Sequence, residues 1–328
     1  MPSGPFPILF FAPADPTDAI LASGVFKRLH DEVENAGFTV VANSKTAPLF
    51  REAPKREATL TPERPGMAGA LALWSRLRRR RWGLVLDAAG LKLAGAIPAR
   101  QRARLEPDAP PAHKVVQAAR LLRLEEAPPA PHVFTSEATA RRGRELVGEG
   151  GPVLALAPAG PWIGRTWPIE RYARVASRLL SEGPLAGGRL VIVGAPEDGK
   201  AADTLRRTIP KDRWIDLTRE PDPLVVHACL SRARLFIGGA SPLTHLAAAA
   251  GAPTLGLYGP DDEAVEGPWG PSARTIRGPR TLAAIRTTDP HLDQPVCHML
   301  DLSVEAVLAA ATRLLDETPS PRQKQPHG

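Results

Sequence analysis

Short apolar runs alternate along the chain with longer segments whose apolar residues recur at helical spacing. In the first half, apolar runs at 7–14 and 38–43 flank a segment whose apolar residues have helical spacing. The pattern predicts that this helix ends at Gly37. Further along, 69–81 and 113–124 favour helices, and 82–90 favours a buried strand. Strands separated by helices are the unit of a parallel sheet. We therefore expect the first half to form a parallel β-sheet with helices packed against it.

The alternation restarts after a helix-like segment at 136–150. The predicted strands are 152–160, 188–198, 214–218, 234–239 and 253–259, and the predicted helices are 168–183, 198–209, 222–233, 242–252 and 302–317. Two such series predict the α/β class with two Rossmann-like domains that face a central cleft, where the carboxyl ends of the strands hold a ligand. We expect an N-terminal domain at 1–145, a C-terminal domain at 146–302, a closing helix at 303–317 and a disordered tail at 318–328.

Composition constrains the class of partner and the cellular compartment. The 328 residues carry a net charge of +7, which suits an anionic partner such as nucleic acid, acidic lipid or a phosphorylated small molecule, without selecting one. The excess arginine could equally reflect a GC-rich genome. The two cysteines form no metal motif and no disulfide framework, which indicates a reducing compartment. No apolar stretch is long enough to span a membrane, and the N-terminus lacks the pattern of a signal peptide.

A strand-to-helix junction at Gly238–His245 is the first candidate site. Ser241 suits a helix N-cap, and Pro242 then falls at the first helical position, where proline is favoured. The amides of Leu243, Thr244 and His245, with the helix dipole, could hold an anion. The alternative is a well-capped helix behind a strand, in which His245 is a packing residue.

A glycine-rich loop after the strand at 152–160 is the second candidate. Arg165 lies just before a predicted helix and could neutralise a diphosphate through two parallel hydrogen bonds. The alternative is an exposed arginine beside Trp167, which would act as a packing anchor. Glu197 and Asp198 follow the next predicted strand, where an acid often binds a ribose hydroxyl, although a simple turn gives the same pattern.

The first loop offers a general base. Asp18 begins a helix after the first strand and could deprotonate a hydroxyl, or it could be an ordinary acid favoured by the helix dipole, with Asp15 as a rival. The basic run Arg76–Trp82 could touch an acidic membrane surface or be a solvated helix end. No RRM, KH or helix-turn-helix pattern supports a nucleic-acid partner.

Together these segments resemble the ADP-heptose lipopolysaccharide heptosyltransferases, the family 9 glycosyltransferases of GT-B fold. The similarity rests on "TDAILASGVFKRL", "WGLVLDAAG", "PAGPWIGRTWPIERY" and "GGASPLTHLAAAAGAPTLGLYGPDDEAVEGPWGP", which occur in the family's order. The last two are the most specific. Two positions depart from the family pattern: Thr17 replaces a glycine, and Ala240-Ser241-Pro242 replaces Asp-Ser-Gly.

The resemblance implies an inverting, metal-independent transferase without a cofactor, whose donor is an ADP-heptose-like nucleotide-diphosphate sugar. Asp18 matches the catalytic acid of the family, while Arg165, the turn after Gly239 and His245 match the donor site. The acceptor would be a lipid-linked glycan, in the cytoplasm or at the periphery of the inner membrane. Because Ala240 has no carboxylate and Pro242 no N–H, the alternative is an impaired relative that binds a nucleotide sugar or acts as a scaffold.

Overall fold

The computed structural model describes residues 4–62, 66–106, 110–160 and 162–318. These residues divide into two units, one ending at Ser136 and the other beginning at Glu137. The division falls before the boundary expected from the sequence, and α4 (Glu137–Val147) explains the difference, because this helix packs on α7 (Pro223–Leu230) of the second unit. The tail predicted at 318–328 lies outside the described residues except for Thr318.

The first unit is a five-stranded parallel sheet in the order β3-β2-β1-β4-β5. Its strands are β1 (Phe6–Phe11), β2 (Ala36–Val41), β3 (Arg56–Leu60), β4 (Trp82–Asp87) and β5 (Ala99–Arg104), and its helices are α1 (Pro16–Glu32), α2 (Gly66–Leu77) and α3 (Lys114–Ala119). Alternate residues of β1 face opposite sides of the sheet, as the strand period requires. Phe10 meets Phe26 of α1, whereas Leu9 and Phe11 pack with Leu73 and Leu77 of α2.

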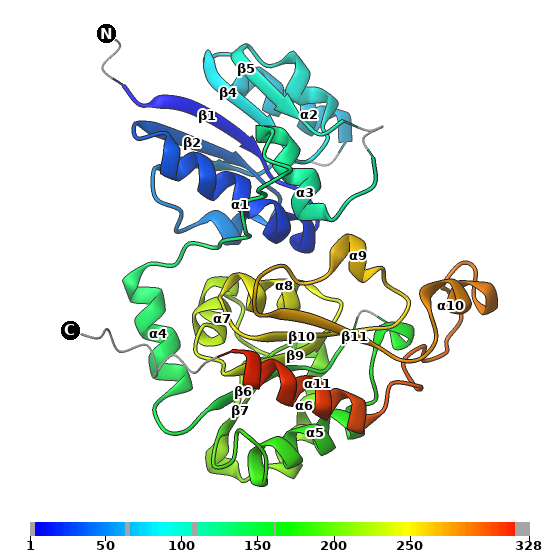
Figure 1. The fold of residues 1–328 in the computed structure, drawn as a ribbon. Coiled ribbons are helices and arrows are strands. Elements are labelled where there is room, and N and C mark those ends of the chain that lie inside the picture. The colour runs from blue at the N-terminus through cyan, green and yellow to red at the C-terminus, as the bar shows by residue number, and fades with distance from the viewer. Residues whose placement is uncertain (1–3, 63–65, 107–109, 161, 319–328) are drawn as a thin grey trace. The chain divides into compact units, whose positions relative to one another are not determined.

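The second unit is a six-stranded parallel sheet in the order β11-β10-β9-β6-β7-β8. Its strands are β6 (Val153–Ala157), β7 (Arg189–Ile192), β8 (Trp214–Asp216), β9 (Leu235–Gly239), β10 (Thr254–Tyr258) and β11 (Ala273–Arg277). Besides α4 and α7, its helices are α5 (Ile169–Ser181), α6 (Gly199–Thr208), α8 (Pro242–Ala249), α9 (Glu263–Glu266), α10 (Leu282–Thr288) and α11 (Val304–Glu317). Figure 1 shows α5, α6 and α11 on one side of this sheet, and α7 and α8 on the other.

The strand orders determine where a ligand can bind in each unit. In the first, the chain reverses direction across the sheet between β1 and β4, and in the second between β6 and β9. Such reversal points leave a crevice at the carboxyl ends of the two central strands. The predicted α/β class with two Rossmann-like domains is confirmed, and the candidate residues can now be located at these two edges.

Candidate functional site

Three loops of the second unit converge at the carboxyl ends of β6, β9 and β10. A Cβ at Gly239 would come within 3.3 Å of the carbonyl oxygen of Arg165, and a Cβ at Gly259 within 3.5 Å of the carbonyl oxygen of Gly164. These contacts show that the loop carrying Arg165 passes close over the ends of β9 and β10, and at Gly259 a Cβ would also come within 2.6 Å of Met299 Cγ. The structure therefore brings Arg165 and the Gly239–Ser241 turn together, as the sequence predicted.

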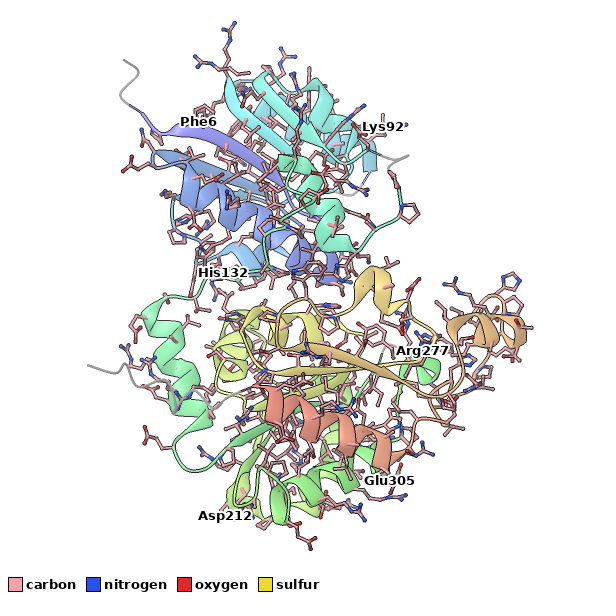
Figure 2. The ribbon with its side chains drawn as sticks, viewed as in Figure 1. Phe6, Lys92, His132, Asp212, Arg277 and Glu305 are labelled. Carbon is pink, nitrogen blue, oxygen red and sulfur yellow. The ribbon has the colours of Figure 1, made fainter. Side chains whose placement is uncertain are left out.

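A buried carboxylate meets Arg165 in this site. Asp261, in the loop after β10, lies with Oδ1 2.5 Å from a terminal nitrogen of Arg165, although the angles are not those of a regular hydrogen bond. The Asp261 side chain is 2% exposed and that of Arg165 36%. Arg277 on β11, labelled in Figure 2, donates to the Asp261 carbonyl at 2.6 Å and also binds Glu263, which fixes the loop.

Burial raises the pKa of the Asp261 carboxyl to about 6, because desolvation outweighs the opposing attraction of Arg165. The carboxyl is therefore close to titration near neutral pH. Among the described residues, Arg165 Nε and Ser241 Oγ are both buried without a hydrogen-bond partner, while Asp261 Oδ1 has only the ion pair with Arg165. Buried polar atoms normally have hydrogen-bond partners, so these atoms at one strand edge indicate a place where a polar ligand completes the network.

The turn after β9 is only partly available to an anion. Ser241 is the N-cap of α8, yet its side chain caps no amide, which leaves the hydroxyl to the site. Thr244 donates its amide to the Ser241 carbonyl at 3.1 Å and its hydroxyl to the Gly239 carbonyl at 2.5 Å. Leu243 follows Pro242 at the second helical position, and His245 is buried one residue beyond Thr244. Contacts of these residues with a donor stay predictions.

The other residues of this edge lie further out or serve packing. Glu197 and Asp198 form a short turn after β7, where Glu197 is exposed and Asp198 accepts the Ala195 amide at 2.7 Å. Their role in binding a ribose stays a prediction. Trp167 is buried and donates to the Leu302 carbonyl at 2.9 Å, which confirms it as a packing anchor that holds the Arg165 loop against the segment before α11.

In the first unit, Asp18 occupies the third position of α1, after β1. The N-cap is Asp15, whose Oδ1 accepts the amides of Thr17 and Asp18 at 2.8 and 3.3 Å. The rival carboxylate is thus engaged in capping, whereas Asp18 lies with Oδ1 2.7 Å from Nζ of Lys114, and its side chain is 39% exposed. Asp18 and Lys114 line a small cavity of about 100 Å³ together with Ala88 and Leu105, which follow β4 and β5.

Two residues of these sites, Lys114 and Asp261, were not predicted from the sequence. Lys114 opens α3, and Asp261 follows β10 in the segment "GPDDE". An acid directly after a predicted strand was the available signal for Asp261, as it was for Glu197. For Lys114 the sequence offered none, because its partner Asp18 is distant along the chain.

The described parts of the chain contain no group of three or more His, Cys, Asp or Glu side chains that could hold a metal ion. Within those same ranges, every helix is too short or too polar to cross a membrane.

Comparison with known proteins gives a family and several solved structures. The family model described as glycosyltransferase family 9 (heptosyltransferase) matches residues 101–291, a range that contains Arg165, Ser241 and Asp261 but not Asp18. No curated protein matches the sequence.

The fold resembles a family 9 glycosyl transferase from Veillonella parvula, with a TM-score of 0.76, 17% identity, and 97% of this chain and 99% of that chain covered. It also resembles the ADP-heptose LPS heptosyltransferase II of E. coli (TM-score 0.72, 20% identity, coverage 94% and 98%). The E. coli heptosyltransferase WaaC with ADP gives a TM-score of 0.70 at 17% identity, with coverage of 94% and 99%. At these identities the likeness shows the fold, which is that of the GT-B heptosyltransferases. The family model covers more than half of the chain, and the chain therefore belongs to glycosyltransferase family 9.

Proposed function

We propose that the protein is an inverting, metal-independent glycosyltransferase that moves a heptose-type sugar from a nucleotide-diphosphate donor to a lipopolysaccharide core or a similar surface glycan. The observation that carries this is the Arg165 site: a cation and a helix N-terminus at the reversal point of the second sheet, where Arg165 Nε and Ser241 Oγ are buried without a hydrogen-bond partner among the described residues. A diphosphate suits such a site by charge and by hydrogen bonding. A structural relative is described with ADP.

In this proposal the acceptor hydroxyl gives its proton to the Asp18 carboxylate while its oxygen attacks the anomeric carbon of the donor. The bond between that carbon and the diphosphate breaks on the opposite face, which inverts the configuration and releases a nucleoside diphosphate. Arg165, by its position beside the α8 N-terminus, would neutralise the charge that develops on the leaving group. Lys114 would hold the Asp18 carboxylate in place until the acceptor arrives.

We further propose that no cofactor takes part and that the donor is ADP-heptose or a close analogue. The acceptor would be a lipid-linked glycan that the enzyme meets from the cytoplasm, at the periphery of the inner membrane. The cysteine usage favours a reducing compartment, and the family membership favours a surface-glycan acceptor.

Calorimetric titration with ADP, GDP and UDP tests the donor site. We expect ADP to bind, and Arg165→Gln to weaken binding about 10- to 100-fold, since a hydrogen bond to a charged group contributes about 1.5–3 kcal/mol. Arg174→Gln, which changes an exposed arginine on α5, is the matched control. If Arg165→Gln binds ADP as well as the control does, the proposed diphosphate site is wrong.

A second candidate, a nucleotide-sugar-binding or scaffold protein without turnover, is favoured by one observation. Pro242 occupies the first helical position of α8 and offers no N–H, while Ala240 has no carboxylate. This candidate predicts donor binding without transfer or hydrolysis, whereas a pure scaffold predicts no binding of any of the three nucleotides.

A further inference from the structure

Helix α2 of the first unit is apolar on two sides, of which only one is covered. Leu73 and Leu77 are buried against β1, but Met67 is 89% and Leu71 64% exposed. Trp74 follows on the same side at helical spacing and is half-buried, with its indole nitrogen donating to the Ala96 carbonyl at 3.2 Å. We call Met67, Leu71 and Trp74 the α2 face. Soluble proteins rarely leave such a row uncovered without a use for it.

A cluster of arginines borders the α2 face. Residues 66–86 contain Arg76 and Arg78–Arg81 and no acidic residue. Arg78 lies over the Trp74 ring, 4.5 Å from its centroid, and Arg80 pairs with Glu57 at 2.7 Å. Arg79 and Arg81 are exposed. The helix therefore presents bulky apolar side chains next to a group of cations.

The cationic region extends beyond the helix. Arg81 lines a cavity of about 660 Å³ with Arg100 and Arg102 of the edge strand β5, and the cavity wall includes the apolar side chain of Phe6. Figure 2 labels Phe6 at the start of β1, and Lys92 beside α2. Three guanidinium groups around an open, partly apolar cavity suit a phosphate that carries an apolar substituent.

We propose that the α2 face and its arginines dock the protein on a bilayer that contains anionic phospholipid. Met67 and Leu71 would enter the boundary between headgroups and acyl chains, while the arginines bind the lipid phosphates. An apolar insertion combined with a polybasic patch is the pair of signals that gives stable peripheral binding, which either signal alone does not. The absence of acidic residues from 66–86 favours an anionic lipid surface over a protein partner of mixed charge. With 12 residues, α2 is too short to span the bilayer.

This inference deepens the proposed function, since an enzyme docked here would meet a lipid-linked acceptor in the membrane plane. It does not depend on catalysis, because vesicle binding can be measured without donor or acceptor. Loss of transfer in an Asp18 variant and loss of vesicle binding in an α2 variant are thus separate results.

The test is co-sedimentation of the full chain with vesicles of phosphatidylglycerol and phosphatidylcholine, with pure phosphatidylcholine as the neutral reference. We expect binding to the anionic vesicles that falls with added salt. Arg79→Gln with Arg81→Gln should weaken it about 30-fold, from the typical contribution of each arginine near an anionic surface. Arg174→Gln with Arg178→Gln on α5 removes the same charge elsewhere and should bind like the unmodified protein.

Met67→Ser with Leu71→Ser should weaken vesicle binding at least about 10-fold while leaving the melting temperature unchanged, because both side chains are exposed. The proposal is overturned if the unmodified chain ignores anionic vesicles, if the α5 control loses as much binding as the α2 arginine variant, or if the serine variant binds undiminished. It is also overturned if the serine variant converts a dimer into a monomer in solution without changing vesicle binding, since the face would then be a contact between copies.

Discussion

Asp261 supplies the carboxylate that meets Arg165, in a chain that has Ala240 where the family pattern has an acid. The two positions follow neighbouring strands, β10 and β9, so both loops reach the same edge of the sheet. Arg165 is therefore paired inside the protein, and the proposed diphosphate would have to compete with Asp261 for it. Protonation of Asp261 near its pKa of about 6 would release the arginine to a ligand.

Replacing Asp261 by asparagine should stabilise the protein at neutral pH. A carboxyl with a pKa of about 6 instead of 3.8 lowers the free energy of unfolding by about 3 kcal/mol at most. Because the folded state holds this proton more tightly than the unfolded chain, the loss is complete above pH 6 and disappears as the pH falls below 3.8. Arg165, which is partly exposed, can be solvated once its partner is gone.

Thermal unfolding of Asp261→Asn and the unmodified protein at pH 8 and at pH 4 measures this effect. The variant should melt higher at pH 8, and the two proteins should converge at pH 4. Asp212→Asn, which removes an exposed carboxylate of the same unit, should show no such difference. A variant that melts lower than the unmodified protein at pH 8 would mean that pairing with Arg165 outweighs the desolvation of Asp261.

At the scale of single residues, the sequence located the cation and the turn but not their partners. Arg165 and Ser241 could be identified because each lies in a glycine-containing loop between a strongly apolar strand and a helix. Their pairing with Asp261 could not, because it depends on three loops converging over glycines that are far apart along the chain. Asp15 and Asp18 look alike as sequence, and only the backbone geometry shows which of them caps α1.

Among the elements, α4 is held to α7 by a close approach of small residues. A Cβ at Gly143 would come within 2.7 Å of the Ala228 backbone and side chain, so any larger residue pushes the two helices apart. We expect Gly143→Ala to lower the free energy of unfolding by about 1–3 kcal/mol, as overpacking of a tight contact does.

Differential scanning calorimetry checks this prediction, with Gly199→Ala at the start of α6 as the control. A Cβ at Gly199 meets no atom within 4 Å, and its φ of −54° suits alanine. This variant should melt at the same temperature or slightly higher, since alanine restricts the unfolded chain. Equal melting of both variants would show that α4 does not pack tightly on α7.

The interior strands could be predicted from the sequence, whereas several edge strands could not. β1, β4, β6 and β9 are buried apolar runs, as expected for strands covered on both faces. β3, β5 and β11 read REATL, ARQRAR and ARTIR, and all three lie at sheet edges, where one side is open and polar residues are tolerated. The helix predicted to end at Gly37 stops at Glu32, and Gly37 lies within β2.

At the scale of the whole molecule, the division after Ser136 predicts which fragment folds alone. A fragment of residues 137–328 keeps α4 on α7, whereas a fragment of 146–328 loses most of α4 and exposes the apolar surface beneath it. We expect the longer fragment to unfold cooperatively at a clearly higher temperature than the shorter one. Circular dichroism melting of the two fragments is the measurement, and equal melting would place the boundary after α4.

The family model matches the two units to different extents. The family model covers residues 101–291, which is most of the second unit but only the end of the first. The proposed donor site is therefore supported by a matched sequence and by local geometry, while the proposed acceptor site is supported by Asp18, its contact with Lys114 and the fold. The cleft expected between the two domains stays a prediction from the sequence.

Sugar transfer by the unmodified protein and by Asp18→Asn, with ADP-heptose as donor and a lipopolysaccharide core as acceptor and mass spectrometry as the readout, is the decisive measurement for the proposed function. We expect the unmodified protein to extend the acceptor, and Asp18→Asn to slow transfer at least about 100-fold because the proposed general base is gone. Calorimetry should find unchanged ADP affinity in the variant. Full transfer by Asp18→Asn, or donor binding without any transfer by the unmodified protein, would contradict the proposed function.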